Sequence, residues 1–118
     1  MATRIERRAE LPVPARIVWE AVSEPRQLSE WFGAEVELDA WPGGRGEFRF
    51  PDGQVRHATV REAEPERRLV IEWEDGGLVE LDIEDGGDES ALVIVETAAA
   101  FASALPRIEA RLSCLVAA

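Results

Sequence analysis

Residues 45–77 read RGEFRFPDGQVRHATVREAEPERRLVIEWEDGG and show the pattern that runs through most of the chain. Phe48 and Phe50 alternate with charged residues, and the same alternation returns in the residues leading to Trp73. A two-residue hydrophobic period indicates β-strands with one buried face and one wet face. The Asp-Gly pair at 52–53, between two such segments, is typical of a tight hairpin turn. This stretch therefore predicts neighbouring antiparallel strands.

The same alternation extends in both directions along the chain. Turn sequences rich in glycine, aspartate and proline separate a first strand over 3–11 from six further strands over about 34–40, 45–50, 54–63, 69–74, 79–84 and 91–95. Strands joined by short turns usually pair with their sequence neighbours. The chain therefore predicts a curved antiparallel sheet of about six to seven strands with one apolar face.

The segment between the first two strands has a helical period instead. Pro14 suits the first turn of a helix, and apolar residues recur at helical spacing up to residue 22. Ser23 is expected to cap a second short helix, with Pro25 in its first turn. Gly33 is expected to end that helix, because glycine readily adopts the left-handed conformation that follows a helix. Two short helices are therefore predicted between the first two strands.

One apolar stripe near the end of the chain is a candidate cover for the sheet. Its members lie on one side of a helix with Pro106 in its first turn, and they are Leu105, Ile108, Leu112, Leu115 and Val116. A sheet with one apolar face has to bury that face against another element. We therefore predict an α+β fold in which residues 1–118 form a single domain and the sheet wraps a C-terminal helix.

The composition argues against several classes of partner. Thirteen arginines and no lysines stand against 24 acidic residues, so the net charge is −11. This charge repels nucleic acid and anionic membrane surfaces. No signal peptide or membrane-spanning stretch is visible, which favours a cytoplasmic protein without membrane insertion. With one cysteine, Cys114, and one histidine, His57, the chain predicts no structural zinc site, and no cofactor is expected.

Two stretches resemble a known superfamily. PARIVWEAV at 14–22, followed by LSEWF at 28–32, is similar to the opening of SRPBCC proteins, which have the START-like helix-grip fold. The stretch from residue 52 to Trp73, with its Pro-Glu-Arg turn at 65–67, resembles the central hairpin of the branch named after the activator of the heat-shock-protein ATPase. The resemblance implies a helix-grip fold around a cavity in which family members bind apolar small molecules.

Aromatic and aliphatic side chains expected on the concave side form the candidate ligand site. Pockets for small apolar molecules are lined mainly by such residues, together with a few polar groups. The candidates are Trp31, Phe32, Phe48, Phe50, His57, Ile71, Trp73 and Leu81. For each aromatic residue, packing in an ordinary core is the alternative. Trp41, beside a Pro-Gly-Gly turn, is expected at a rim, and Trp19 is expected at the periphery.

The strand over 54–63 leaves the direction of His57 open. Val55, His57 and Thr59 share one face, and Arg56, Ala58 and Val60 share the other. An inward His57 would offer a polar contact or a general base near neutral pH. The family resemblance favours Val60 inward, which turns His57 outward. Glu96 and Asp82 would act as acids only if they are buried with raised pKa values.

Three functions are compatible with these residues. The first is a non-catalytic domain that binds a hydrophobic small molecule in an internal cavity. The second is an enzyme of the cyclase, aromatase or dehydratase kind, which requires an inward-facing acid–base pair. The third is a protein-interaction module, either co-chaperone-like or self-associating. A homodimer would use Val93 and Val95, which lie on the strand face opposite Leu92 and Ile94.

Overall fold

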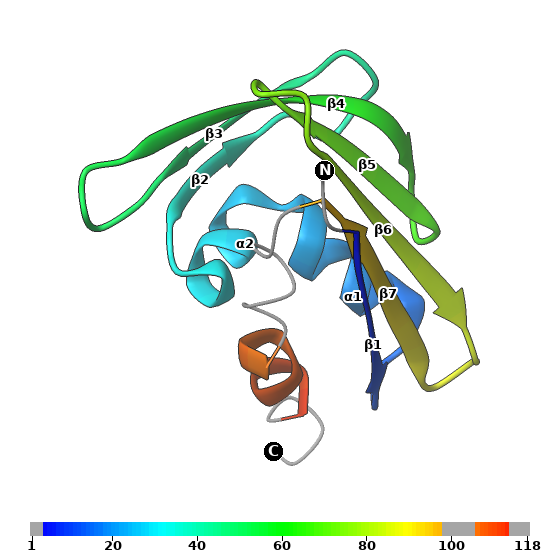
Figure 1. The fold of residues 1–118 in the computed structure, drawn as a ribbon. Coiled ribbons are helices and arrows are strands. Elements are labelled where there is room, and N and C mark those ends of the chain that lie inside the picture. Colours follow the sequence, from blue (N-terminus) through cyan, green and yellow to red (C-terminus); the bar gives the residue numbers. More distant parts are fainter. Residues whose placement is uncertain (1–3, 98–105, 114–118) are drawn as a thin grey trace.

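The computed structural model describes residues 4–97 and 106–113 (Figure 1). The elements follow one another as β1 (Ile5–Leu11), α1 (Ala15–Ser23), α2 (Pro25–Phe32), β2 (Glu35–Leu38), β3 (Arg45–Arg49), β4 (Val55–Glu64), β5 (Arg68–Trp73), β6 (Leu78–Asp85) and β7 (Ser90–Glu96). A further helix, here called the C-terminal helix, covers residues 106–113. The predicted order of one strand, two helices, six strands and a helix is confirmed.

All seven strands form one antiparallel sheet. The strand order is β1-β7-β6-β5-β4-β3-β2, so β1 closes one edge against β7 and β2 lies at the other. The sheet curves around α1 and α2, and the C-terminal helix lies beside them at the open side of the curve (Figure 1). This arrangement confirms the predicted α+β helix-grip fold, because a curved antiparallel sheet holds helices on its concave face.

The concave face of the sheet is apolar because every second residue of each strand points into it. Phe48, Ile71, Leu81 and Ile94 are all fully buried there. In β4, Ala58 and Val60 are buried while their neighbours are exposed, and the pairing with β5 shifts by one residue directly after Val60. Such a bulge changes which face the following residues occupy. It explains why one period does not describe the whole of this strand.

The α1–α2 junction differs from the expectation at one residue. Ser23 does not cap α2: it is the last residue of α1, and its hydroxyl donates to the Trp19 carbonyl oxygen at 2.6 Å. A serine in a helix can satisfy its hydroxyl on the carbonyl four residues earlier, and this bond competes with capping. Pro25 is the first residue of α2, and Gly33 ends it at φ +89°, both as predicted.

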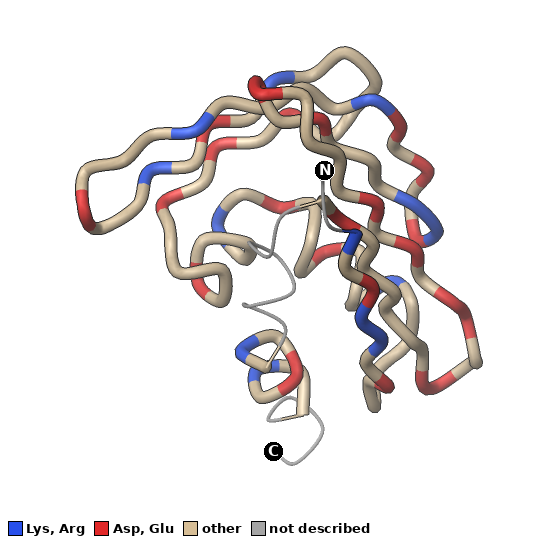
Figure 2. The backbone as a smooth tube through the Cα atoms, viewed as in Figure 1, with Lys and Arg blue, Asp and Glu red and all other residues tan. Residues whose placement is uncertain are grey.

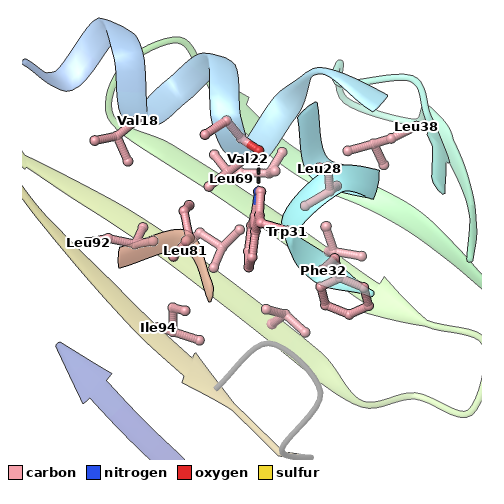
Figure 3. Packing of buried hydrophobic residues seen from close by; sticks show 14 of the residues in the cluster. Val18, Val22, Leu28, Trp31, Phe32, Leu38, Leu69, Leu81, Leu92 and Ile94 are labelled. Atoms are coloured by element: carbon pink, nitrogen blue, oxygen red, sulfur yellow. Dashed lines mark hydrogen bonds between the residues drawn. The ribbon is translucent and has the colours of Figure 1, made fainter. Parts of the chain in front are cut away.

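The buried residues form one cluster that includes both the sheet and the helices. The side chain of Trp31 lies at its centre, between the helices and the strands (Figure 3). Ile108 and Leu112 of the C-terminal helix belong to the same cluster and are fully buried, as their apolar stripe predicts. The other predicted stripe members, Leu105, Leu115 and Val116, lie outside the described residues. Of the helices described, none is long and apolar enough to cross a membrane.

The convex face of the sheet has the opposite character. Acidic and basic positions are interleaved along the strands and their turns (Figure 2). Arg68 is the best connected of these residues: it donates two hydrogen bonds to Asp82 and one to Glu80, over 2.7–2.8 Å. These bonds raise the pKa of Arg68 above its ordinary value. Asp82 is therefore the partner of an arginine on the outer face rather than a buried acid.

Candidate ligand-binding site

Five aromatic rings are joined by contacts beneath the sheet, and we call them the aromatic cluster. Phe32 is the hub: its ring centroid lies 6.0 Å from Trp31, 5.3 Å from Phe48 and 6.1 Å from Phe50. Phe48 continues the cluster to Trp73, with 4.8 Å between centroids and edge-to-face geometry. Such edge contacts are favourable for aromatic pairs. The cluster thus runs continuously from α2, across β3, to the end of β5.

Local structure explains how these rings meet. Trp31 and Phe32 are the last two residues of α2, and both are buried in the cluster shared by the helices and the sheet. Phe48 is on the inner face of β3, and Trp73 is on the inner face of β5. Four of the five rings are buried, whereas Phe50, just beyond β3, is partly exposed. Ile71 and Leu81 lie on the same inner face and are buried beside them.

The aromatic cluster reaches the surface next to Arg56. This residue lies on the inner face of β4, directly opposite Phe48 in the register of β3 and β4. Its guanidinium carbon lies 4.0 Å from the centroid of the Trp73 ring, which is a cation–π contact. An open hollow of about 270 Å³ lies at this end of the sheet and is lined by Val55, Arg56, His57, Trp73, Glu74 and Asp75. We call it the Arg56 hollow.

A second hollow lies at the other end of the aromatic cluster. It lies where α2 and β3 end. It is lined by Ser29, Gly33, Ala34, Glu35, Arg49, Phe50 and Pro51. The Ser29 hydroxyl fixes this corner: it donates to the Pro25 carbonyl at 2.7 Å and accepts from the Val36 amide at 2.8 Å. The aromatic cluster is therefore bordered by a hollow at each of its two ends.

The C-terminal helix is attached to the end of α2 that carries the cluster. Arg107 donates from Nε to the Trp31 carbonyl at 2.8 Å and from Nη2 to the Phe32 carbonyl at 2.9 Å. The last carbonyls of a helix lack partners within it, and a cation is favourable at this negative end. One turn later, Arg111 forms an ion pair with Glu30. Two arginines therefore hold the C-terminal helix against the last turn of α2.

His57 does not face the interior. It lies on the outer face of β4, its side chain is 56% exposed, and its ring nitrogens lie 3.2 Å from Glu47 and 3.4 Å from Glu74. The structure thus removes His57 from the inward-facing candidates, as the family resemblance favoured. Desolvation raises the pKa of Glu47, but hydrogen bonds from Arg49 and His57 outweigh it, so this pKa lies below its ordinary value.

Glu96 is the one buried carboxylate among the described residues. It is 1% exposed and follows the alternation of Leu92 and Ile94, so it lies on the inner face of β7. Its cross-strand neighbours are Val79 on β6 and Ile5 on β1. A carboxylate in an otherwise apolar row of the sheet is unusual, because burying a charge is costly. Glu96 is therefore buried and inward-facing, which meets the first of the two conditions that the sequence analysis set for an acid.

Comparison with known protein families gave a match over most of the chain. The family described as "Activator of Hsp90 ATPase homolog 1-like protein" matches residues 12–111. The chain belongs to this family. A search of curated proteins found no match.

Solved structures support the same fold. The solution structure of the Aha1 dimer from Colwellia psychrerythraea has a TM-score of 0.79 at 15% identity, covering 93% of this chain and 96% of that one. The protein NE0264 from Nitrosomonas europaea has a TM-score of 0.78 at 16% identity, covering 98% and 97%. CalU16 from Micromonospora echinospora has a TM-score of 0.73 at 27% identity, covering 89% and 73%. The chain is therefore similar to these proteins over most of its length.

The sequence analysis did not single out the arginines that lie beside the aromatic cluster. Arg56 shares the phase of Ala58 and Val60, and this phase could have placed it inside, next to Phe48. Arg107 and Arg111 are four residues apart on the C-terminal helix, which also indicates a shared face. No pattern, however, indicates that Arg107 bonds backbone carbonyls 75 and 76 residues away.

Proposed function

We propose that this domain binds a small hydrophobic molecule at the aromatic cluster, between the sheet and the C-terminal helix, and performs no chemistry on it. The observation that supports this proposal is the unbroken contact of five aromatic rings between two surface hollows. Aromatic linings with a few polar groups at the edge are typical of sites for small apolar ligands. The same proposal places the protein in the cytoplasm, where it needs no cofactor.

Side chains at the two ends of the cluster would have to move to admit a ligand. Trp31, Phe32 and Phe48 are buried on all sides, so a ligand that enters between them must displace well-packed groups. Phe50 and Arg56 border the hollows and are only partly buried, so their rotation costs less. Entry at these two residues therefore costs less than entry between the buried rings.

A titration with N-phenyl-1-naphthylamine, a neutral probe that fluoresces in apolar surroundings, tests the proposal. We expect saturable binding to the wild-type protein and roughly five- to tenfold weaker binding to Phe50→Ala, because the variant loses an aromatic contact at the mouth. Trp41→Ala is the matched control, since Trp41 is 60% exposed and outside the cluster. Absence of saturable binding, or equal losses in the two variants, would overturn the proposal. Circular dichroism checks that each variant is folded.

The buried Glu96 favours one alternative, an enzyme of the cyclase, aromatase or dehydratase kind. Its carboxyl would donate or accept a proton at the apolar site, and burial is the usual way such a group is tuned. His57 is on the outer face of β4, whereas Glu96 is on the inner face of β7, so the two do not form an inward-facing pair. Any compound found by the binding screen can be incubated with wild-type protein and with Glu96→Gln. Conversion by the wild type alone would support the enzyme, and an unchanged compound in both would rule it out for that compound.

The outer face of β7 supports the second alternative, an interaction module that associates with a second copy. Val93 and Val95 are only half-buried there, and the similar Colwellia protein was solved as a dimer. Val95 lies between Glu6 of β1 and Glu80 of β6, so two such faces would bring four carboxylates together. Salt screens this repulsion. We expect light scattering to show association that increases with salt concentration; a monomer at every salt concentration would exclude this face.

A further inference from the structure

We propose that Arg56 binds an anionic group of the ligand, so that the molecule taken up is an apolar organic acid rather than a neutral hydrocarbon or alcohol. This inference rests on the proposed function, because it names the chemistry of the ligand at the same site. It concerns the Arg56 hollow alone, and it adds a charged contact at the point where the aromatic cluster meets the surface.

Arg56 is a charged residue on the apolar face of the sheet. Along the inner face of β4, Arg56 is followed by the buried residues Ala58 and Val60, and across the sheet it faces the fully buried Phe48. An arginine at such a position breaks an otherwise apolar face. Its side chain is only 25% exposed, and the Trp73 ring supports the guanidinium from one side. A guanidinium that lies over a ring keeps N–H groups along its edge available to a planar acceptor such as a carboxylate.

The guanidinium of Arg56 has hydrogen-bonding capacity to spare. Within the described part of the chain, its guanidinium makes no hydrogen bond, although it has five N–H donors. Its nearest carboxylate is Asp75, with 3.6 Å between Nη2 and Oδ2. Arg68 and Arg107, which have structural roles, each donate two or more hydrogen bonds of 2.7–2.9 Å. Arg56 is therefore placed like a binding group rather than like the structural arginines of this chain.

The ion pair between Arg56 and Asp75 is weak. Asp75 lies in the turn between β5 and β6, and its side chain is 72% exposed. Ion pairs with so exposed a partner contribute little, because water and salt screen them. A ligand carboxylate that enters the Arg56 hollow would replace Asp75 as the partner of the guanidinium. The apolar part of the ligand would then lie against Trp73, which also lines the hollow.

A purely structural role is the competing explanation. In that case the cation–π contact merely covers the Trp73 ring, and the charge of a ligand makes no difference. Glu74 and Asp75 also line the hollow, and their charges oppose an anion. The two explanations differ in one measurable quantity, which is the preference of the site for an anionic ligand over a neutral one of the same shape.

Two probes with one ring system measure that preference. N-phenyl-1-naphthylamine is neutral, and 1-anilinonaphthalene-8-sulfonate has the same rings with a sulfonate, which stands in for the carboxylate. We expect the wild-type protein to bind the sulfonate roughly tenfold more tightly than the neutral probe, as one charge-assisted contact would give. Arg56→Gln should abolish this preference, so that the two probes bind the variant with affinities within about twofold of each other.

Arg61→Gln is the matched control, because Arg61 is on the same strand, is exposed, and pairs with Glu72 on the outer face. It should leave the preference unchanged. Displacement of the bound sulfonate by octanoate but not by octanol would extend the result to carboxylates. If neither probe binds the wild type, the proposed function fails, and this inference fails with it. If both probes bind and Arg56→Gln leaves their ratio unchanged, only the role of Arg56 is overturned.

Discussion

The indole nitrogen of Trp31 donates a hydrogen bond of 2.7 Å to the carbonyl oxygen of Ala21 (Figure 3). Ala21 lies in the last turn of α1, and its carbonyl would normally accept from the amide four residues later. That residue is Pro25, which has no N–H to donate. The side chain at the centre of the core therefore satisfies a carbonyl that the proline leaves open, and the bond fixes α2 relative to α1.

Replacing Trp31 by phenylalanine should cost about 2–4 kcal/mol in the free energy of unfolding. The variant leaves a buried carbonyl without its donor, and it also leaves a cavity because phenylalanine is smaller than tryptophan. Urea unfolding followed by circular dichroism measures the change. Trp41→Phe is the control: Trp41 is 60% exposed, so its change should stay within about 0.5 kcal/mol. Equal effects in the two variants would contradict the role given to the Ala21 bond.

Arg107→Gln should destabilise the protein by about 1–2 kcal/mol. The variant loses two charge-assisted hydrogen bonds to the end of α2, and the low value allows for the partial exposure of these bonds. Arg26→Gln, at an exposed position of α2 itself, is the control and should change stability by less than about 0.5 kcal/mol. The same urea experiment suffices. A stability loss in the control as large as that of Arg107→Gln would show that the bonds to α2 are not the cause.

Gly33→Ala should destabilise the protein more than Gly53→Ala. Both glycines have nearly the same positive φ, +89° and +91°, so alanine suffers about the same backbone strain, roughly 1 kcal/mol, at each. A β-carbon at Gly53 would meet nothing within 4 Å, whereas one at Gly33 would lie 3.2 Å from the Arg107 guanidinium. The difference between the two variants therefore reports the displacement of Arg107.

A double-mutant cycle isolates that contact. In the Arg107→Gln background, the crowding at Gly33 is relieved, so Gly33→Ala should cost about as much as Gly53→Ala does. If the difference between the two glycine variants persists without Arg107, the extra cost comes from some other neighbour of Gly33. Thermal unfolding of the four single and double variants supplies all of the necessary values.

The sheet could be predicted from the sequence because its signal is local. Alternation around Phe48 and Trp73 fixes which side chains point inward without any knowledge of the other strands. The directions of the side chains in β4, which contains His57, were harder to predict from the sequence. The bulge after Val60 shifts the period within that strand, so neither face is apolar throughout, and the direction of His57 could not be settled.

The candidate site was less predictable because its polar contacts are not local. Arg107 bonds backbone carbonyls, which every residue has, so no residue type marks its partners. The phase of Arg56 in β4 is that of an inward-facing residue. Its cation–π contact, however, depends on where the Trp73 ring lies, and this position follows only from the pairing of β4 with β5.

Acidification should weaken the attachment of β1 to the sheet at Glu84. Arg8 of β1 reaches across β7 to Glu84 of β6, with 2.8 Å between Nη2 and Oε1. The hydrogen bond from Arg8 lowers the pKa of Glu84 below its ordinary value, against a smaller opposing effect of desolvation. A carboxyl whose pKa is lower in the folded state stabilises that state above its unfolded pKa. This stabilisation is lost as the pH falls through the folded value.

An NMR titration of the Glu84 carboxyl carbon measures this shift. The midpoint should lie below the ordinary glutamate value of about 4.3, and Arg8→Gln should return it toward that value. Arg16→Gln, which changes an ion pair on α1, should leave the midpoint unchanged. Because both Arg8 and Glu84 are about half exposed, 1 M salt should reduce the shift. A midpoint that is ordinary in the wild type, or one that Arg8→Gln fails to raise, would show that the guanidinium does not hold this carboxylate in solution.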